Sequence, residues 1–274
     1  MKPRHFLTLP DLAPAELKRV LARAMEMKAM LKRGERHIPL AGKTMGMIFE
    51  KSSTRTRVSF QVGMAQLGDT SLFLSPRDTH LDRGEPVEDT ARVMSRMVDI
   101  VVIRANSPAM VERFAAHSQV PVVNALTDLD HPCQLLADIQ TWIEKRGDIA
   151  GKKVAWIGDG NNVCHSWISA ARLLGFRLDI ATPKGYEPKA EIVAASGDRI
   201  TLYHDPKQAA RGADIVVTDT WASMGQEHEK AERIKAFAGF MVDGALMKLA
   251  SQDAVFMHCL PAYRGMEVAA EVID

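Results

Sequence analysis

Short apolar runs alternate with amphipathic stretches along almost the whole chain. The apolar runs have the length of buried strands and occupy residues 44–50, 69–74, 99–105, 120–125, 152–158, 177–183, 213–219 and 254–261. Stretches with apolar residues three or four positions apart lie between them, at residues 14–32, 58–67, 88–97, 109–118, 131–146 and 164–174. Strands that alternate with helices in this way indicate parallel sheets with helices on their faces, so we predict an α/β fold.

The alternation pauses at the long helical stretch 131–146 and then starts again. A chain of 274 residues also exceeds what one compact core usually holds. We therefore predict two lobes, residues 1–140 and 141–274, each with its own mostly parallel sheet. In sheets of this kind ligands bind at the carboxyl ends of the strands, and the candidate residues are to be sought there.

Composition narrows the range of partners. The formal net charge is +1, 25% of the residues are charged and 46% are hydrophobic, with no long basic or acidic block. Nucleic acids and membrane surfaces are therefore not expected as partners. The N-terminal residues lack the apolar core of a signal peptide, and no apolar run reaches the roughly 18 residues of a membrane span, so we expect a cytoplasmic protein. Cys133, Cys164 and Cys259 are widely spaced, which predicts neither a disulfide framework nor a metal cluster.

The sequence KSSTRTR, residues 51–57, lies between a predicted strand and a predicted helix. Its hydroxyl side chains can cap the first helical amides, and those amides together with the helix dipole favour an anion at the same place. Arg55 and Arg57 lie about 200° apart on a helix, so one can bind the anion while the other holds the helix to its neighbours. A capped surface helix with solvated arginines fits these residues too. The pattern of a P-loop is absent.

Two further polar positions of the first half follow predicted strands. Arg104 lies at the end of an apolar run, where it is either a ligand contact or part of a salt bridge at the edge of the sheet. In the sequence HPCQ, Pro132 suits the first position of a helix, which places His131 near the N-cap and Gln134 on the first turn. Neighbouring amides should keep the imidazole of His131 neutral, so that it can polarise a carbonyl group. A purely structural cap is the alternative.

The sequence WIGDGNN, residues 156–162, matches part of the fingerprint of dinucleotide-binding proteins. Gly158 and Gly160 are present, but Val163 takes the third glycine position. A nicotinamide-dependent dehydrogenase is therefore an alternative, which titration with NADH would test. Asn162 in this turn is better suited to hydrogen-bonding a small polar ligand.

Asp219 ends another apolar run and is followed by Ser223 and Met224. A carboxylate at the end of a strand can hold an ammonium group, and it can equally cap a helix. The sequence therefore leaves both interpretations of Asp219 open.

The sequence HCLP follows the last predicted strand. Leu260-Pro261 leaves the carbonyl oxygens of Cys259 and Leu260 uncommitted to a helix. His258 and Cys259 are adjacent on a strand and point to opposite faces, so they do not form a nucleophilic pair.

In order along the chain, FEKSSTRTR, HPCQ, DTWASMGQE and HCLPAYRG resemble the motifs of the transcarbamoylase family. The S-T-R-T-R and H-P-x-Q pieces resemble those shared by its aspartate and ornithine branches, and D-x-x-x-S-M-G resembles the ornithine branch. The resemblance covers nearly the whole chain. It implies transfer of the carbamoyl group from carbamoyl phosphate to the δ-amine of L-ornithine, which gives L-citrulline and phosphate. It also implies that the substrates bind in the cleft between the lobes, without a metal or cofactor.

The resemblance further implies roles for single residues. Carbamoyl phosphate would be bound by Ser53, Thr54, Arg55, Thr56, Arg104, His131 and Gln134. Ornithine would be bound by Asn162, Asp219, Ser223, Met224, Cys259 and Leu260, with a cis peptide bond before Pro261. The catalytic residues would be Arg55, Arg104, His131, Asp219 and Cys259.

Members of this family form homotrimers in which each active site receives a residue from the adjacent subunit. In this chain His80, in the loop 75–86, is the predicted residue. Family members also continue past the position of Asp274, through a segment resembling AENR whose arginine approaches carbamoyl phosphate, to a final helix.

The closest alternative is a transcarbamoylase that accepts another amine, such as putrescine or N-acetylornithine. Asp219 argues against it, because this carboxylate suits a free α-ammonium group. A regulator that binds a phosphorylated metabolite without turnover is a third class, which an activity assay would exclude.

Overall fold

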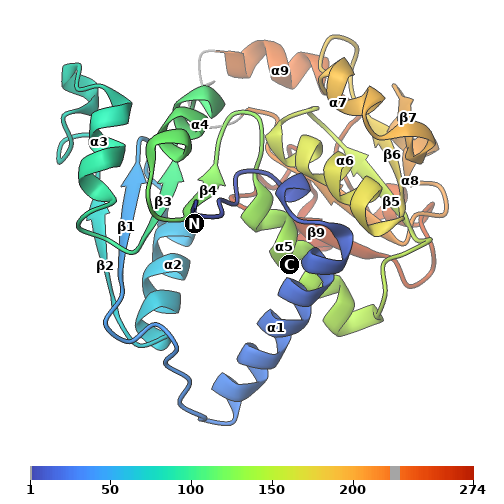
Figure 1. Cartoon of the computed structure of the whole chain (residues 1–274). Helices are drawn as coiled ribbons and strands as arrows, with labels where there is room; N and C mark the ends of the chain where they lie inside the picture. The colour runs from blue at the N-terminus through green and yellow to red at the C-terminus, as the bar shows by residue number, and fades with distance from the viewer. Residues whose placement is uncertain (1, 223–228) are drawn as a thin grey trace. The chain divides into compact units, whose positions relative to one another are not determined.

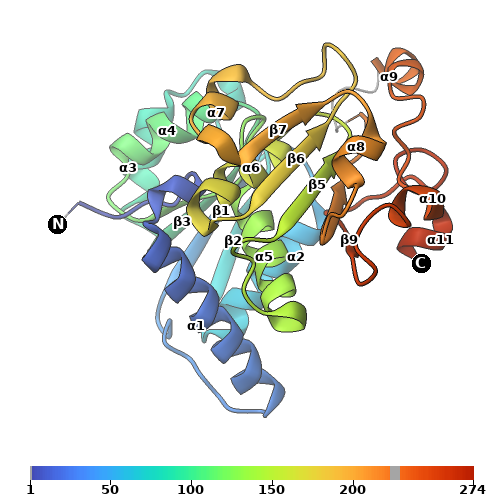
Figure 2. The ribbon, with the colours of Figure 1, turned by 90° about the vertical axis from the view of Figure 1, so that its right-hand side faces the viewer.

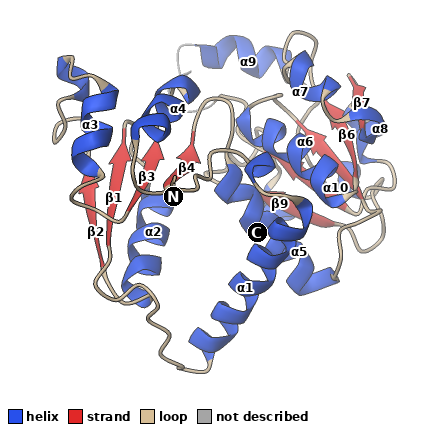
Figure 3. Ribbon diagram, in the orientation of Figure 1, coloured by secondary structure: helices blue, strands red, loops and turns tan. Residues whose placement is uncertain are grey.

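The computed structural model describes residues 2–222 and 229–274. The chain divides into two compact units, Met1–Leu136 and Ala137–Asp274. Each unit contains one sheet of parallel strands flanked by helices, so the predicted α/β fold is confirmed (Figure 1, Figure 3). Within the described residues, no helix has both the length and the apolar character needed to span a membrane.

The first unit is built on a four-stranded sheet with the order β2-β1-β3-β4. Its strands are β1 (Thr44–Phe49), β2 (Thr70–Leu74), β3 (Ile100–Arg104) and β4 (Val122–Leu126). The helices of this unit are α1 (Pro14–Lys32), α2 (Thr54–Gln66), α3 (Val87–Met94) and α4 (Pro108–His117), with 3-10 turns η1 (Leu9–Asp11) and η2 (Leu81–Arg83).

Both faces of the first sheet are apolar, because successive strand residues point to opposite sides. Met47 and Val102 share one cluster with Met64 of α2. Ile48 belongs to the cluster on the other face, together with Phe114 of α4. Burial on both sides explains why these strands read as continuous apolar runs in the sequence.

The second unit is built on a five-stranded sheet with the order β7-β6-β5-β8-β9 (Figure 2). Its strands are β5 (Lys153–Ile157), β6 (Arg177–Ala181), β7 (Ile200–Tyr203), β8 (Ile215–Thr218) and β9 (Val255–His258). Helix α5 (Pro132–Arg146) starts in the first unit and continues into the second. The other helices are α6 (Asn162–Leu174), α7 (Ala190–Ala194), α8 (Pro206–Ala210), α9 (Lys230–Ala236), α10 (Gly244–Met247) and α11 (Ala270–Ile273), with the 3-10 turn η3 (Gly197–Arg199).

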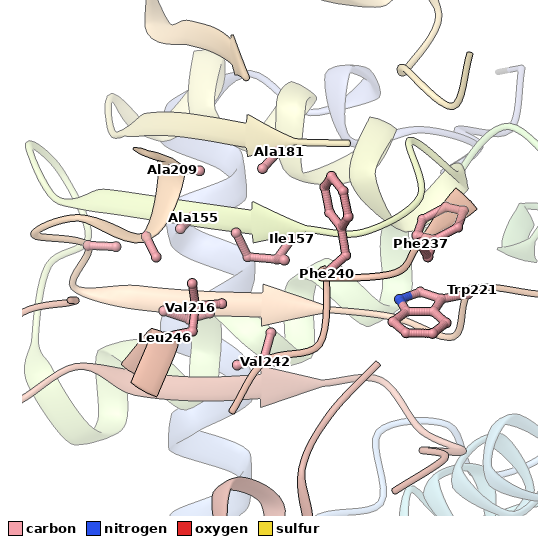
Figure 4. Close-up of a cluster of buried hydrophobic side chains, with 12 residues drawn as sticks. Ala155, Ile157, Ala181, Ala209, Val216, Trp221, Phe237, Phe240, Val242 and Leu246 are labelled. Carbon is pink, nitrogen blue, oxygen red and sulfur yellow. The ribbon is translucent and has the colours of Figure 1, made fainter. Parts of the chain in front are cut away.

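An aliphatic and aromatic cluster covers one face of the second sheet (Figure 4). Ile157 of β5 and Val216 of β8 belong to it, together with Leu246 of α10. The rings of Trp221 and Phe237 stack in the same cluster with their centroids 5.6 Å apart. Because Trp221 follows shortly after β8, this packing fixes the backbone where β8 ends.

The strand order reverses once in each sheet. In the first unit the chain passes from β1 out to β2 and then places β3 and β4 on the other side of β1. In the second unit it passes from β5 to β6 and β7 and then places β8 and β9 on the other side of β5. Open α/β sheets bind ligands at the carboxyl ends of the two strands that flank such a switch point. The topology therefore points to the ends of β1 and β3, and to the ends of β5 and β8.

Some elements were not predicted from the sequence. Strand β7 lies at an edge and exposes Thr201 and Leu202, so it has no continuous apolar run. Helices α7 to α11 have four to seven residues, which is too short for helical periodicity to show. The predicted start of α2 at residue 58 was late, because Ser53 caps the helix and Thr54 begins it.

Candidate active site

The first group of candidate residues surrounds the N-terminus of α2. Ser53 is the N-cap of this helix, and its side chain accepts a hydrogen bond from the amide of Thr56 over 3.3 Å. The side chains of Thr54 and Arg55 are exposed on the first turn. The remaining amides of this turn and the positive end of the helix dipole make the place suitable for an anion.

Arg104 reaches this helix start from the neighbouring strand. Arg104 pairs with Phe49 in the register of β3 and β1, and its carbonyl oxygen accepts the amide of Glu50 over 2.8 Å. Its Nη1 donates to the hydroxyl of Thr56 over 3.4 Å. Only 5% of Arg104 is exposed, so a full positive charge is held in a largely desolvated position beside the start of α2.

Arg55 and Arg57, at the N-terminus of α2, have different roles, as their spacing predicts. The guanidinium group of Arg57 lies 3.6 Å from the centroid of the Phe73 ring on β2, and its Nε donates to Gln61. Arg57 therefore holds α2 against the sheet. Arg55 is exposed on the first turn and is the arginine available for an anion.

His131 and Gln134 follow strand β4, which pairs with β3. Helix α5 starts at Pro132, as predicted, so His131 directly precedes it. Burial, together with the positive charge of Arg104, lowers the pKa of His131 to about 3. The predicted neutral imidazole is therefore correct. Its main cause is desolvation rather than the amides of the helix.

Cys133 lies between these two residues and is chemically inert. Its thiol donates to the carbonyl oxygen of Asn124 over 3.4 Å. Burial raises the pKa of Cys133 to about 12, so the group stays a thiol at neutral pH.

His80 belongs to the loop between β2 and α3. It is exposed and precedes η2 in the loop after β2, where its carbonyl oxygen accepts the amides of Arg83 and Glu85. Asp78 folds this loop back by accepting both the amide and the hydroxyl of Ser75. None of the described contacts in this unit links His80 to the start of α2.

The second group of candidates meets at the switch point of the second sheet. Asp219 directly follows β8, and only 7% of it is exposed. One of its carboxylate oxygens, Oδ2, accepts the side-chain amide of Asn161 over 2.7 Å. The other, Oδ1, accepts the amide of Thr220 over 2.7 Å and the thiol of Cys259 over 3.1 Å. Three strand ends, those of β5, β8 and β9, therefore converge on one carboxylate.

The sequence interpretation missed Asn161. Its side-chain oxygen accepts the amides of Val163 and Cys164, so Asn161 is the N-cap of α6. An asparagine directly before an apolar helix is a recognisable N-cap signal. Asn162, which the family resemblance selects, is the first helical residue and lies next to this junction.

Cys259 and Leu260 directly follow the strand β9, and Leu260-Pro261 is cis, as the resemblance implies. Burial and the carboxylate of Asp219 raise the pKa of Cys259 well above its ordinary value. The group is therefore a protonated donor to Asp219 and not a thiolate nucleophile. Ser223 and Met224, the other two predicted ornithine contacts, lie outside the described residues.

Asp219, His258 and Cys259 each place a potential ligand atom within 4.8 Å of the others. Both ring nitrogens of His258 are already engaged, because Nδ1 accepts the amide of Leu260 and Nε2 lies 3.2 Å from Glu267. A metal ion here would have to displace one of these hydrogen bonds and deprotonate the thiol. The donor set thus disfavours a metal centre.

A buried ion pair that the sequence did not indicate supports the turn after β5. Nη1 of Arg233, on α9, lies 2.8 Å from the carboxylate of Asp159 and also donates to the carbonyl oxygen of Trp221. Burial raises the pKa of Asp159 to about 6 in spite of this guanidinium group. Arg233 therefore ties the turn after β5 to the segment after β8, on the two sides of the switch point.

The backbone fills the place where a dinucleotide would need to approach. The amide of Gly160 donates to the carbonyl oxygen of Tyr186 over 2.9 Å. A Cβ atom at Gly160 would lie 2.2 Å from the nitrogen of Pro188. The close approach that this glycine permits is therefore to the chain itself, which argues against the nicotinamide alternative.

Comparison with known proteins agrees with this geometry. Residues 4–144 match the family model described as aspartate/ornithine carbamoyltransferase, carbamoyl-P binding domain. Residues 150–274 match the model of the Asp/Orn binding domain. The chain belongs to the aspartate/ornithine carbamoyltransferase family. The first carbamoyltransferase model ends at residue 144 and the second begins at residue 150, so the boundary between them lies at the end of α5.

The relatives within the carbamoyltransferase family match over most of their length. An ornithine carbamoyltransferase from Methylococcus capsulatus is 62% identical over 274 residues, which cover 100% of this chain and 91% of that protein. The structure of ornithine carbamoyltransferase from Pyrococcus furiosus has a TM-score of 0.95 and 48% identity, and 100% of this chain and 90% of that chain are covered. The structure of anabolic ornithine carbamoyltransferase from Campylobacter jejuni has a TM-score of 0.91 and 46% identity, and 99% of this chain and 90% of that chain are covered.

Proposed function

We propose that this chain is an ornithine carbamoyltransferase. It transfers the carbamoyl group of carbamoyl phosphate to the δ-amine of L-ornithine and forms L-citrulline and phosphate. The observation that carries the proposal is the chemical contrast between the two switch points. One holds arginines, hydroxyl groups and a helix N-terminus, and the other holds a buried carboxylate with amides around it. An anionic substrate suits the first, and an amino acid with a free ammonium group suits the second.

The first unit would bind carbamoyl phosphate. We assign the phosphate to Ser53, Thr54, Arg55 and Thr56 at the start of α2, where amides, hydroxyl groups and one guanidinium group converge. Arg104 donates to the hydroxyl of Thr56 and can reach from the phosphate towards the carbonyl oxygen. We assign the carbamoyl group to His131 and Gln134.

The same residues would lower the barrier of the reaction. As the amine attacks, a C–N bond forms and negative charge grows on the carbonyl oxygen. The C–O bond to phosphate then breaks, and phosphate leaves with the electron pair and takes up the proton that the amine loses. Donors aimed at such an oxygen are worth a factor of about 10²–10³ each. Arg55, Arg104 and His131 are the proposed donors. His131 serves as a neutral donor, because its pKa of about 3 keeps it uncharged at working pH.

The second unit would bind L-ornithine. We assign the α-ammonium group to Asp219 and the α-carboxylate to Asn162, with Ser223 and Met224, which lie outside the described residues, completing that end. The backbone carbonyl oxygens of Cys259 and Leu260 would hold the δ-amine. Cys259 would thus act through its carbonyl oxygen and through the hydrogen bond by which its thiol orients Asp219.

Asp219 also argues against other acceptors. N-acetylornithine carries a neutral amide in place of the α-ammonium group. A buried carboxylate left without a cationic partner is costly, so this compound would bind less well than ornithine. Putrescine keeps an ammonium group for Asp219 but lacks the α-carboxylate, so it would lose the contact that we assign to Asn162.

We further propose that the enzyme is a homotrimer and that His80 enters the active site of a neighbouring subunit. The exposed face of α2 supports self-association, because Val58 and Val62 are 51% and 46% exposed on it. These valines line a shallow groove whose other residues include Thr54 and Arg55, so a subunit seated there would lie beside the proposed phosphate site.

The role in arginine biosynthesis is a proposal as well, supported by the relative from Campylobacter jejuni that is described as anabolic. The cytoplasmic location expected from the sequence stays a prediction.

Citrulline formation by the wild type and two arginine variants tests the function. Arg55→Ala should lower kcat/KM for carbamoyl phosphate by about 10²–10³, because it removes a charged donor from the reacting group. Arg57→Ala is the matched control, since Arg57 lies two residues away and packs on Phe73. It should stay within a few-fold of the wild type. Putrescine and N-acetylornithine are assayed beside ornithine. An unchanged rate in Arg55→Ala, or faster turnover of either other acceptor, would contradict the proposal.

A further inference from the structure

Leu260 adopts an unusual backbone conformation. Its φ angle is +60°, and among the described residues it is the one residue other than glycine with a positive φ. A side chain disfavours this region, so neighbouring contacts must hold the backbone there. One such contact is the hydrogen bond from the amide of Leu260 to Nδ1 of His258, at 2.8 Å.

This hydrogen bond fixes the tautomer of His258. Because Nδ1 accepts the amide of Leu260, it carries no proton, and the proton of the neutral ring lies on Nε2. Nε2 then donates to Oε1 of Glu267 over 3.2 Å. The same oxygen accepts the amide of Tyr263 over 2.6 Å. The ring thus bridges Glu267 to the backbone that follows β9.

Glu267 is well placed to hold the ring. It is 0% exposed, and its carbonyl oxygen accepts the amide of Val242, which belongs to the main cluster of the second unit. The side chain of His258 is 2% exposed. A buried carboxylate anchored to the core in this way can fix both the orientation and the tautomer of the imidazole.

The hydrogen bonds of His258 and Glu267 do not include the thiol of Cys259. His258 and Cys259 do not point apart as expected from the strand pattern, because their potential ligand atoms lie within 4.8 Å of each other. The thiol nevertheless donates to Asp219 at 3.1 Å, while the ring nitrogens of His258 are engaged by Leu260 and Glu267. The hydrogen bonds of His258 lead instead to Leu260, whose backbone the proposed function assigns to the ornithine δ-amine. The contacts therefore connect Glu267 with the position of the nucleophile.

We propose that Glu267 and His258 are positioning residues for the ornithine amine: Glu267 fixes the Nε2–H tautomer of His258, and His258 holds the amide of Leu260. The carbonyl oxygens of Cys259 and Leu260 then point at the δ-amine. This inference rests on the proposed function, and it predicts loss of ornithine affinity without loss of carbamoyl phosphate affinity.

Two pairs of variants in the full-length enzyme test the proposal. Glu267→Gln keeps an oxygen that accepts from Nε2, and Glu267→Ala removes it. His258→Asn keeps an acceptor near the position of Nδ1, and His258→Gln moves the amide group towards Glu267 and away from Leu260. The measurements are kcat and the KM of each substrate, with melting temperatures to confirm folding.

Glu267→Ala and His258→Gln should raise the KM for ornithine by about tenfold while the KM for carbamoyl phosphate changes less than about twofold. Glu267→Gln and His258→Asn should raise the KM for ornithine by a clearly smaller factor. Unchanged KM for ornithine in His258→Gln, or equal increases in both KM values, would overturn the inference. If Glu267→Ala does not fold, the KM values of the two His258 variants decide whether the inference holds. Failure of the wild type to form citrulline would refute the proposed function instead, so the two results are distinguishable.

Discussion

Asn161 donates a hydrogen bond from Nδ2 to Oδ2 of Asp219 over 2.7 Å, and this bond joins the turn after β5 to the end of β8. The two residues lie 58 positions apart in the sequence and meet because β5 and β8 are neighbours at the switch point. Asn161 also caps α6, so one side chain sets both the start of that helix and the orientation of the carboxylate. Asp219 is therefore held in place before any ligand binds, which is the preorganisation that specific binding of a cation requires.

The first prediction concerns the charge of Asp219. Asp219→Asn keeps the shape of the side chain and removes its charge, so kcat/KM for ornithine should fall by about 10- to 100-fold through the loss of a charged hydrogen bond. The KM for carbamoyl phosphate should hardly change. Asp253→Asn, at an exposed position of the same unit, is the control for removal of one negative charge. Equal losses in the two variants would argue against an ammonium site at Asp219.

The second prediction separates the two neighbouring asparagines. Asn161→Ala removes a helix cap and a hydrogen bond to a buried carboxylate, so it should destabilise the second unit by about 1–2 kcal/mol. Asn162→Ala should lower ornithine affinity with little effect on stability, because we assign this side chain to the α-carboxylate. Urea unfolding and ornithine KM, measured on both variants, would show the two effects. A loss of stability confined to Asn162→Ala would reverse the assignment.

The sequence predicted the positions that depend on one strand and its next turn. Arg104 lies at the end of an apolar run, and Ser53 and His131 lie within a few residues of one. The carboxyl ends of parallel strands meet at one edge, so the proximity of these residues could be expected. The link from Asn161 to Asp219 could not be predicted in the same way. It requires the order of β5 and β8, which long-range packing decides. Glu267 was missed for the same reason, because nothing local in the sequence shows that its carboxylate faces His258.

The third prediction concerns pH. The pKa of His131 is lowered from 6.5 to about 3, so this residue does not titrate between pH 6 and 8. The amine of ornithine, with a pKa near 10.4 for a lysine-like group, is mostly protonated in this range. We therefore expect kcat/KM for ornithine to rise by about tenfold per pH unit from pH 6 to 8. His131→Asn should give a lower rate with the same slope. Loss of the slope in this variant would identify His131 as the titrating group.

The lowered pKa of His131 also has a consequence for stability. Between about pH 3 and 6.5 the unfolded chain binds more protons at this residue than the folded chain. Its contribution to stability is therefore fully present above pH 6.5 and is lost as the pH falls towards 3. The melting temperature of His131→Asn should fall less between pH 7 and 5 than that of the wild type, as differential scanning calorimetry can measure.

The fourth prediction tests the proposed homotrimer. Val62→Glu places a charge in the apolar groove on α2, and burying that charge at a subunit contact would be costly, so the trimer should dissociate. Activity should fall with it, because His80 would no longer reach a neighbouring site. Val93→Glu, at a valine of α3 with 50% exposure, is the matched control. Sedimentation equilibrium would measure the masses, and a trimer that survives Val62→Glu would contradict this placement of the contact.

The last prediction concerns the turn that carries Asn161 and Asn162. A Cβ atom at Gly160 would lie 2.2 Å from the nitrogen of Pro188, which is backbone and cannot simply rotate away. Gly160→Ala must therefore push the turn and the segment around Pro188 apart, at a cost of about 1–3 kcal/mol, and ornithine affinity should fall with stability. Gly244→Ala is the matched control, because its Cβ would meet the side chain of Glu271 at an ordinary 3.7 Å.

Tryptophan fluorescence suits this measurement. All four tryptophans lie at positions 142, 156, 167 and 221, within the second unit, so their signal reports the unfolding of the unit that contains both glycines. Gly244→Ala should match or slightly exceed the wild type in the midpoint of urea unfolding, since alanine is the better helix former by up to about 1 kcal/mol. A midpoint for Gly160→Ala equal to that of Gly244→Ala would mean that the turn after β5 is not packed against Pro188. The backbone at Gly160 would then be free for the close approach of a dinucleotide.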